Sequence, residues 1–144
     1  MIRVGIVGSR RRATCTDHEI VQGIVRAAVE RYGKEEVVIV SGGCPIGADT
    51  FARLSAEAHD VWCVEFKPKV RPNTTRWEFT VAAFARNRTI AENCDVLFAL
   101  VANDRKGGTE NTIEHAHELK KIVYVIDETG QAYLEKDGEV ANKA

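Results

Sequence analysis

The sequence has no marked excess of charge of either sign and no long apolar run. Its 20 Lys and Arg residues are balanced by 21 Asp and Glu residues, which gives a formal net charge of −1 at pH 7. Any binding of nucleic acid must therefore depend on a local basic patch. No apolar stretch approaches the roughly 20 residues that cross a bilayer, and the first residues do not resemble a signal peptide. We expect a cytoplasmic protein that does not contact a membrane.

Paired cysteines and internal repeats are also missing. The chain has 4 cysteines, which stand far apart without a CxxC pair, so we expect neither a bound metal nor a cofactor. Repeats and low-complexity tracts are absent, and 144 residues fit a single domain. We expect that domain to cover residues 1–127, followed by a polar C-terminal tail or short hairpin over residues 128–144.

The sequence does contain a regular alternation of short apolar strands and longer helical segments. Strands are predicted at 2–7, 37–40, 61–66, 95–101 and 122–127, and helices at 18–32, 48–59, 77–93 and 109–120. Asp17 is the expected N-cap and Gly33 the expected C-cap of the first helix. Such alternation is typical of parallel βαβ units under helices on both faces. We expect an α/β fold, namely a three-layer Rossmann-like fold with a five-stranded parallel sheet in the order 3-2-1-4-5.

Glycine turns follow three of these strands. They are Gly8-Ser9, Gly42-Gly43 and Gly107-Gly108-Thr109, and in this strand order they open on one cleft at the carboxyl ends of the strands. A strand, a glycine turn and a helix N-terminus together favour an anion, because free N–H groups and the helix dipole point the same way. The alternative is a plain connection between strand and helix, which glycine also favours.

Four ordered motifs resemble the SLOG superfamily, the Rossmann-like group named for Smf/DprA and LONELY GUY proteins, and within it the small YpsA-like branch. The motifs are GSR at 8–10, SGG-x-x-x-GAD at 41–49, RNR-x-I-A-x-x-x-D at 86–95 and GGT-x-x-TI-x-x-A at 107–116. The resemblance implies a nucleotide or phosphorylated nucleoside derivative in the cleft, and frequently a homodimer. It does not fix a reaction, because the superfamily contains enzymes, ligand sensors and DNA-binding proteins.

A binding or sensing role is the leading interpretation of these motifs. Backbone amides near Gly42-Gly43 and Gly108-Thr109 would hold phosphate, arginines would neutralise its charge, and Asn87 would orient the ligand or the loop. Asp49 could bind a ribose hydroxyl or cap its helix. The expected ligand-binding residues are Gly8, Ser9, Arg10, Ser41, Gly42, Gly43, Gly47, Asp49, Arg86, Asn87, Arg88, Gly107, Gly108 and Thr109.

A nucleotide N-glycosidase of the LONELY GUY type is the first alternative. Phosphoribohydrolases of that family carry PGG-x-GT-x-x-E, and matching its GT to Gly108-Thr109 puts Thr112 where the catalytic glutamate belongs. A threonine neither stabilises an oxocarbenium-like transition state nor activates water well. Glu110 and Glu114 are the remaining candidates for a catalytic carboxylate, and the substitution favours a protein that is not an enzyme.

Single-stranded nucleic acid binding, which the resemblance to DNA-processing protein A suggests, is the second alternative. The loop from residue 67 to residue 76 carries Lys67, Lys69, Arg71 and Arg76, with aromatic residues nearby as stacking platforms. The competing interpretation is a solvated loop with the aromatic residues packed in the core. The next helix is apolar on most of its circumference, so we expect burial on two sides, by the sheet and by a second subunit of a homodimer.

Overall fold

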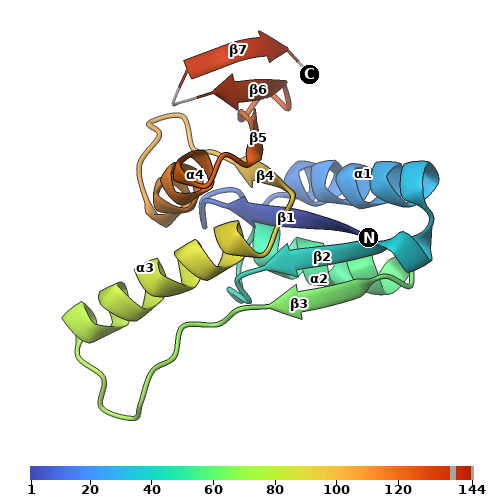
Figure 1. The fold of residues 1–144 in the computed structure, drawn as a ribbon. Helices are drawn as coiled ribbons and strands as arrows, with labels where there is room; N and C mark the ends of the chain where they lie inside the picture. The colour runs from blue at the N-terminus through green and yellow to red at the C-terminus, as the bar shows by residue number, and fades with distance from the viewer. Residues whose placement is uncertain (137–138, 144) are drawn as a thin grey trace.

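The computed structural model describes residues 1–136 and 139–143, which form one sheet with helices on both faces (Figure 1). No helix of this part of the chain is long and apolar enough to span a bilayer. The elements in chain order are β1 (Ile2–Gly8), α1 (Cys15–Tyr32), the short 3-10 helix η1 (Lys34–Glu36), β2 (Val37–Ser41), α2 (Ala48–Ala58), β3 (Trp62–Glu65), α3 (Arg76–Glu92), β4 (Val96–Leu100), α4 (Gly108–Glu118), β5 (Ile122–Ile126), β6 (Ala132–Lys136) and β7 (Glu139–Lys143).

The sheet has the strand order β3-β2-β1-β4-β5-β6-β7. The first five strands pair in parallel, with Val4 of β1 beside Ile39 of β2 on one edge and beside Val96 of β4 on the other. The predicted order 3-2-1-4-5 is therefore confirmed. The sheet is wider than predicted, because β6 pairs antiparallel with β5 and β7 antiparallel with β6. The division of the chain at residue 127 stays a prediction.

The apolar run of β2 explains how the sheet is covered. Successive side chains of a strand point to opposite faces. Val37 and Ile39 lie in the core beneath α1 and α2, whereas Val38 and Val40 lie in a second core beneath α3 and α4. A strand that is apolar at every position therefore needs helices on both sides, which is the three-layer arrangement that the sequence predicts.

The first helix begins earlier than predicted. Thr14 is its N-cap, with Oγ1 accepting the N–H of Asp17 at 3.1 Å, and the Asp17 carboxylate accepts the N–H of Thr14 at 3.2 Å. Asp17 is thus the third helical residue of a capping box and not the N-cap, so that prediction is wrong by three positions. Gly33 ends the helix as predicted, with a φ of 85°.

Helix α3 is buried near its carboxyl end and exposed over much of the rest. Asn87, Ile90 and Ala91 are its buried residues. In contrast, Trp77 is 73% exposed and Val81 is 50% exposed, and in Figure 1 the amino-terminal half of the helix projects past the sheet. The expected burial on two sides is therefore not achieved within one chain.

We predict that Trp77 and Val81 are covered in a homodimer, because apolar side chains gathered on one projecting helix mark an interaction site. Light scattering at micromolar concentration should give twice the chain mass of 15.9 kDa. Replacing both residues by Glu should give a folded monomer. The matched control is Trp62→Glu on β3, where Trp62 is 79% exposed, and this change should leave the dimer intact. A wild-type protein that is monomeric throughout would contradict the prediction.

Candidate functional site

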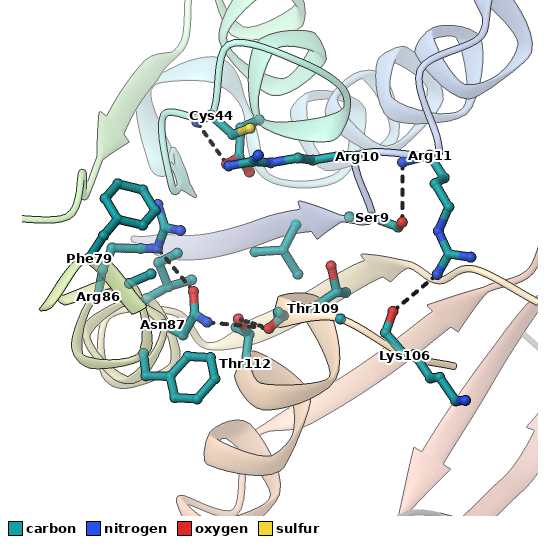
Figure 2. A pocket seen from close by; sticks show the side chains of 18 residues that line it. Ser9, Arg10, Arg11, Cys44, Phe79, Arg86, Asn87, Lys106, Thr109 and Thr112 are labelled. Atoms are coloured by element: carbon teal, nitrogen blue, oxygen red, sulfur yellow. Dashed lines mark hydrogen bonds between the residues drawn. The ribbon is translucent and has the colours of Figure 1, made fainter. Parts of the chain in front are cut away.

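A cavity of about 350 Å³ opens at the carboxyl ends of β1 and β4 (Figure 2). These two strands lie side by side in the middle of the sheet, and the helices that follow them leave on opposite faces. The connections that follow β1 and β4 therefore diverge at this point and leave a crevice between them, which is where open α/β sheets usually bind ligands. The lining residues are Val7, Gly8, Ser9, Arg10, Arg11, Cys44, Asp49, Phe79, Ala83, Phe84, Arg86, Asn87, Ile90, Lys106, Gly107, Gly108, Thr109 and Thr112.

Arginines of the turn after β1 form one cationic side of the cavity. Arg11 donates two hydrogen bonds to the Asp104 carboxylate, at 2.9 and 2.7 Å, and a third to the carbonyl oxygen of Lys106 at 3.2 Å. This bidentate pair ties the turn after β1 to the loop after β4. Arg10 reaches the other way, toward Cys44, as Figure 2 shows. In the described part of the chain no carboxylate forms an ion pair with Arg10 or Lys106.

Arg86 and Asn87 of α3 connect the remaining glycine turns. The Arg86 Nη1 donates to the carbonyl oxygen of Gly42 at 2.6 Å, and its Nε donates to Oδ1 of Asn87 at 2.9 Å. Asn87 in turn donates from Nδ2 to the carbonyl oxygen of Gly108 at 3.2 Å. Burial lowers the pKa of the Arg86 guanidinium, Asp49 opposes this, and Arg10 adds to it. Two cationic groups are thus held close together with one carboxylate.

That carboxylate, Asp49, is fixed by hydrogen bonds from β2 and from the turn after it. Its Oδ1 accepts the Ser41 hydroxyl and its Oδ2 accepts the Cys44 N–H, both at 2.9 Å. The space is tight, because a Cβ on Gly42 would lie 2.7 Å from Nη1 of Arg86 and 2.8 Å from Oδ2 of Asp49. Glycine is therefore needed at position 42 for the arginine and the carboxylate to stand beside the backbone.

The four main helices begin in two different ways. Helices α1 and α3 each start with a threonine capping box, whereas α2 and α4 start at Gly47 and Gly107 with no side-chain cap. The start of α2 is covered, because a Cβ on Gly47 would lie 3.3 Å from the Arg12 carbonyl oxygen. The start of α4 faces the cavity through Gly107, Gly108 and Thr109. Backbone N–H groups at this helix start are therefore available to donate hydrogen bonds to an anion in the cavity.

The opposite wall of the cavity is apolar and comes from α3. Phe79 and Phe84 line it and are 42% and 46% exposed, with Ala83 between them. Partly exposed aromatic rings next to arginines suit a planar, anionic ligand, since rings stack on the aromatic faces and the guanidinium groups pair with charge.

The structure gathers most of the predicted ligand-binding residues, but not all of them. Ser41, Gly42, Gly43 and Gly47 lie behind the lining, where Ser41 and Gly42 contact Asp49 and Arg86. Arg88 points away, toward Glu118 and His115 of α4. Those lining the cavity are Gly8, Ser9, Arg10, Asp49, Arg86, Asn87, Gly107, Gly108 and Thr109.

Neither glutamate considered for catalysis lines the cavity. Both carboxylate oxygens of Glu110 accept hydrogen bonds from Arg105 at 2.9 Å. Glu114 is exposed on α4. Thr112, at the position of the family's catalytic glutamate, is buried and does line the cavity. Among the described residues no three His, Cys, Asp or Glu side chains converge to hold a metal ion.

Sequence reasoning missed several residues of this wall. Arg11 and Lys106 flank predicted motifs and Cys44 lies inside one, so adjacency to a glycine turn was the available signal. Phe79 and Phe84 gave no such signal, because a sequence does not tell which side of an apolar helix faces a cavity.

We predict that the thiols differ sharply in reactivity. Burial, mainly, raises the pKa of Cys63 and of Cys94 to about 11, so at pH 8 only about one in a thousand of either would be thiolate, the reactive form. Iodoacetamide should modify exposed Cys15 and partly exposed Cys44, and the other two only after denaturation. The variant Cys44→Ser should lose one of the two fast sites. Rapid labelling of Cys94 in the folded protein would contradict this prediction.

Comparisons with known proteins agree with this fold. Two structures of a molybdenum cofactor carrier protein from Chlamydomonas reinhardtii both have a TM-score of 0.63, with 15% and 18% identity. The alignments cover 89% and 86% of this chain and 78% and 75% of the carrier protein. An X-ray structure of TM1055 has a TM-score of 0.59 and 15% identity, over 85% of this chain and 72% of that one. These likenesses show the fold alone, and no curated protein matches the sequence.

The family is shown by the first half of the chain. Residues 2–72, which contain β1 to β3 and the glycine turns after β1 and β2, match the model of the YspA, cpYpsA-related SLOG family. This match assigns residues 2–72 to the YspA, cpYpsA-related SLOG family, which confirms the family predicted from the motifs.

Proposed function

We propose that the protein binds a nucleotide or a phosphorylated nucleoside derivative in this cavity, in a binding or sensing role. The observation that carries the proposal is the convergence of Arg10, Arg11, Arg86 and Lys106 with the uncapped start of α4. Four cationic side chains line the same cavity as one carboxylate, Asp49. A ligand that brings its own negative charge offsets this excess.

The two walls suit the two parts of a nucleotide. The phosphate would lie at the start of α4, between Lys106 and the turn of Arg10 and Arg11. The base would lie against Phe79 and Phe84, where stacking is worth roughly 1–3 kcal/mol per base. A volume of about 350 Å³ is at the small end of the range for ligand sites, which favours a mononucleotide. The carrier protein of the same fold is named for carrying the molybdenum cofactor, so a binding role has a precedent on this fold.

We expect AMP to raise the melting temperature and to protect Cys44 from alkylation, since Cys44 lines the cavity. Cys15 lies outside the cavity and is the internal control. Arg10→Ala should weaken binding about ten- to hundredfold, because a hydrogen bond to a charged group contributes about 1.5–3 kcal/mol. The matched control is Arg31→Ala, on the far end of α1, which should bind normally.

Calorimetric titration with AMP, other nucleoside monophosphates and NAD fragments decides this proposal. If none of them binds or protects Cys44, the proposed function is wrong. Protection of Cys15 to the same extent would point to a general effect on the protein and would count against the site.

We expect nucleoside monophosphates to be hydrolysed slowly or not at all. Loss of an acid–base group costs about 10²- to 10⁴-fold in rate, and the cavity has Thr112 in place of the glutamate while Arg105 engages Glu110. Chromatography should therefore find no free base released from bound AMP. Robust release of base that disappears in Glu110→Gln, but not in Glu114→Gln, would overturn this prediction and make the glycosidase alternative the leading one.

Single-stranded nucleic acid is the second candidate, and it would compete with the predicted homodimer for the exposed side chain of Trp77. A groove of about 350 Å³ runs between the loop and α3, lined by Lys69, Arg71 and Trp77 among others. The alternative interpretation, in which Trp77 packs in the core, is not what the structure has, since Trp77 is 73% exposed. Basic groups beside an aromatic platform are typical of single-strand binding.

If a strand binds in this groove, oligothymidylate should quench the fluorescence of Trp77. Trp77→Phe should lose the signal, and Trp62→Phe should keep it. Binding should weaken steeply with salt, as phosphate contacts do. Residues of α3 that line the groove, such as Ala85, do not line the cavity, so AMP should not compete. Absence of quenching at low salt would remove this candidate.

A further inference from the structure

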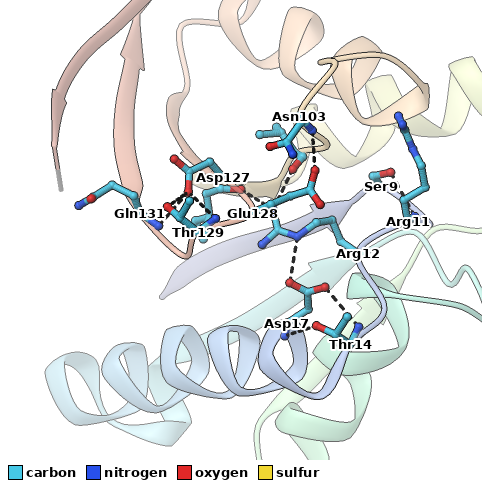
Figure 3. A network of polar contacts seen from close by, with 12 residues as sticks. Ser9, Arg11, Arg12, Thr14, Asp17, Asn103, Asp127, Glu128, Thr129 and Gln131 are labelled. Carbon is cyan, nitrogen blue, oxygen red and sulfur yellow. Dashed lines mark hydrogen bonds and ion pairs between the residues drawn. The ribbon is translucent and has the colours of Figure 1, made fainter.

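The guanidinium of Arg12 is buried beside the cavity, although it is not part of its lining. Arg12 is 2% exposed. Its Nε donates to Oδ1 of Asp17 at 2.9 Å, and its Nη1 donates to the carbonyl oxygens of Val101 and Ile126, both at 2.8 Å (Figure 3). Nη2 has no hydrogen-bond partner in the described part of the chain.

These bonds join segments that are far apart in sequence. Val101 directly follows β4 and Ile126 is the last residue of β5, so both carbonyls lie at the carboxyl edge of the sheet. Asp17 lies in the first turn of α1. Arg12 itself closes the turn after β1, because its N–H donates to the Ser9 carbonyl oxygen at 2.9 Å. One buried side chain therefore fixes that turn against the ends of two neighbouring strands.

The residues held at the tip of this turn are Arg10 and Arg11, both of which line the cavity. The segment that begins at Val101 continues to Lys106 and the uncapped start of α4, on the other side of the cavity. Arg12 thus joins the turn after β1 to the start of the loop after β4, and its buried bonds hold these two cationic loops at a fixed distance. Arg11 adds a second connection through Asp104, but that pair is exposed, and exposed pairs hold geometry weakly.

We propose that Arg12 is the positioning residue of the anion site, which fixes Arg10 and Arg11 at the correct distance from α4. This inference rests on the proposed function, and no contact of Arg12 with the ligand is required. A lysine at position 12 keeps the charge but loses the planar fork that serves Asp17 and two carbonyls at once. The turn would then be free to move, and affinity would fall although every residue in contact with the ligand is retained.

The test compares Arg12→Lys with a double variant, Arg12→Met with Asp17→Asn, which removes both charges and so avoids an unpaired buried carboxylate. The matched control is Arg3→Lys. Arg3 also pairs with an aspartate, Asp95, and also joins β1 to β4, but at the opposite end of the sheet. Hydrogen exchange without ligand and calorimetric titration with AMP are measured on each, together with thermal melting.

In both Arg12 variants we expect amides of residues 9–12 and 101–107 to exchange about tenfold faster than in the wild type. The Kd for AMP should rise about tenfold in Arg12→Lys and further in the double variant. The Arg3→Lys control should melt at a lower temperature but keep the wild-type Kd. If exchange in the two loops is unchanged, or if Arg3→Lys weakens AMP equally, Arg12 is a stabilising residue only and the inference is wrong. If the wild type binds no AMP but the loops still loosen, the proposed function fails while the positioning role stands.

Discussion

The parallel pairing of β1 with β4 determines where the cavity of this protein opens. The two strands are far apart in sequence, and β1 reaches β2 on its other edge. Because right-handed crossovers then send the following helices to opposite faces, the chain parts above this pair of strands. The turn after β1 and the loop after β4 come to face each other across the opening. The cationic residues on both are brought together by topology and not by nearness in the chain.

Helix capping explains which end of which helix remains available. Thr14 and Thr75 each accept one amide N–H of the first turn, in α1 and α3 respectively. At α2 the turn after β1 covers the start of the helix and leaves little room for an added anion. Helix α4 has neither a capping side chain nor a cover, and three of its residues line the cavity. Of the two helices without a side-chain cap, α4 is thus the one whose start faces the arginines across the cavity.

The sequence predicts the secondary-structure elements around this site and their order better than it predicts the width of the sheet or the buried contacts of Arg12. Runs such as VVIV in β2 and the glycine turns after strands predict elements and their order, since strand burial and turn geometry are local properties. The width of the sheet was missed because β6 alternates weakly and follows a polar turn. Arg12 was missed for a different reason. A buried arginine is identified by the carbonyls around it, and Val101 and Ile126 lie about 90 and 110 residues away in the chain.

The balance of charge around the cavity favours the binding role that we propose over catalysis. Three carboxylates lie in or near the cavity, and each already accepts hydrogen bonds from other groups of the chain. Asp104 pairs with Arg11, Glu110 pairs with Arg105, and Asp49 accepts two hydrogen bonds from the chain. Of these three carboxylates only Asp49 lines the cavity. The cations, by contrast, exceed their partners at the cavity wall. A cavity wall with more cationic groups than carboxylate partners fits the anionic ligand that we propose for it.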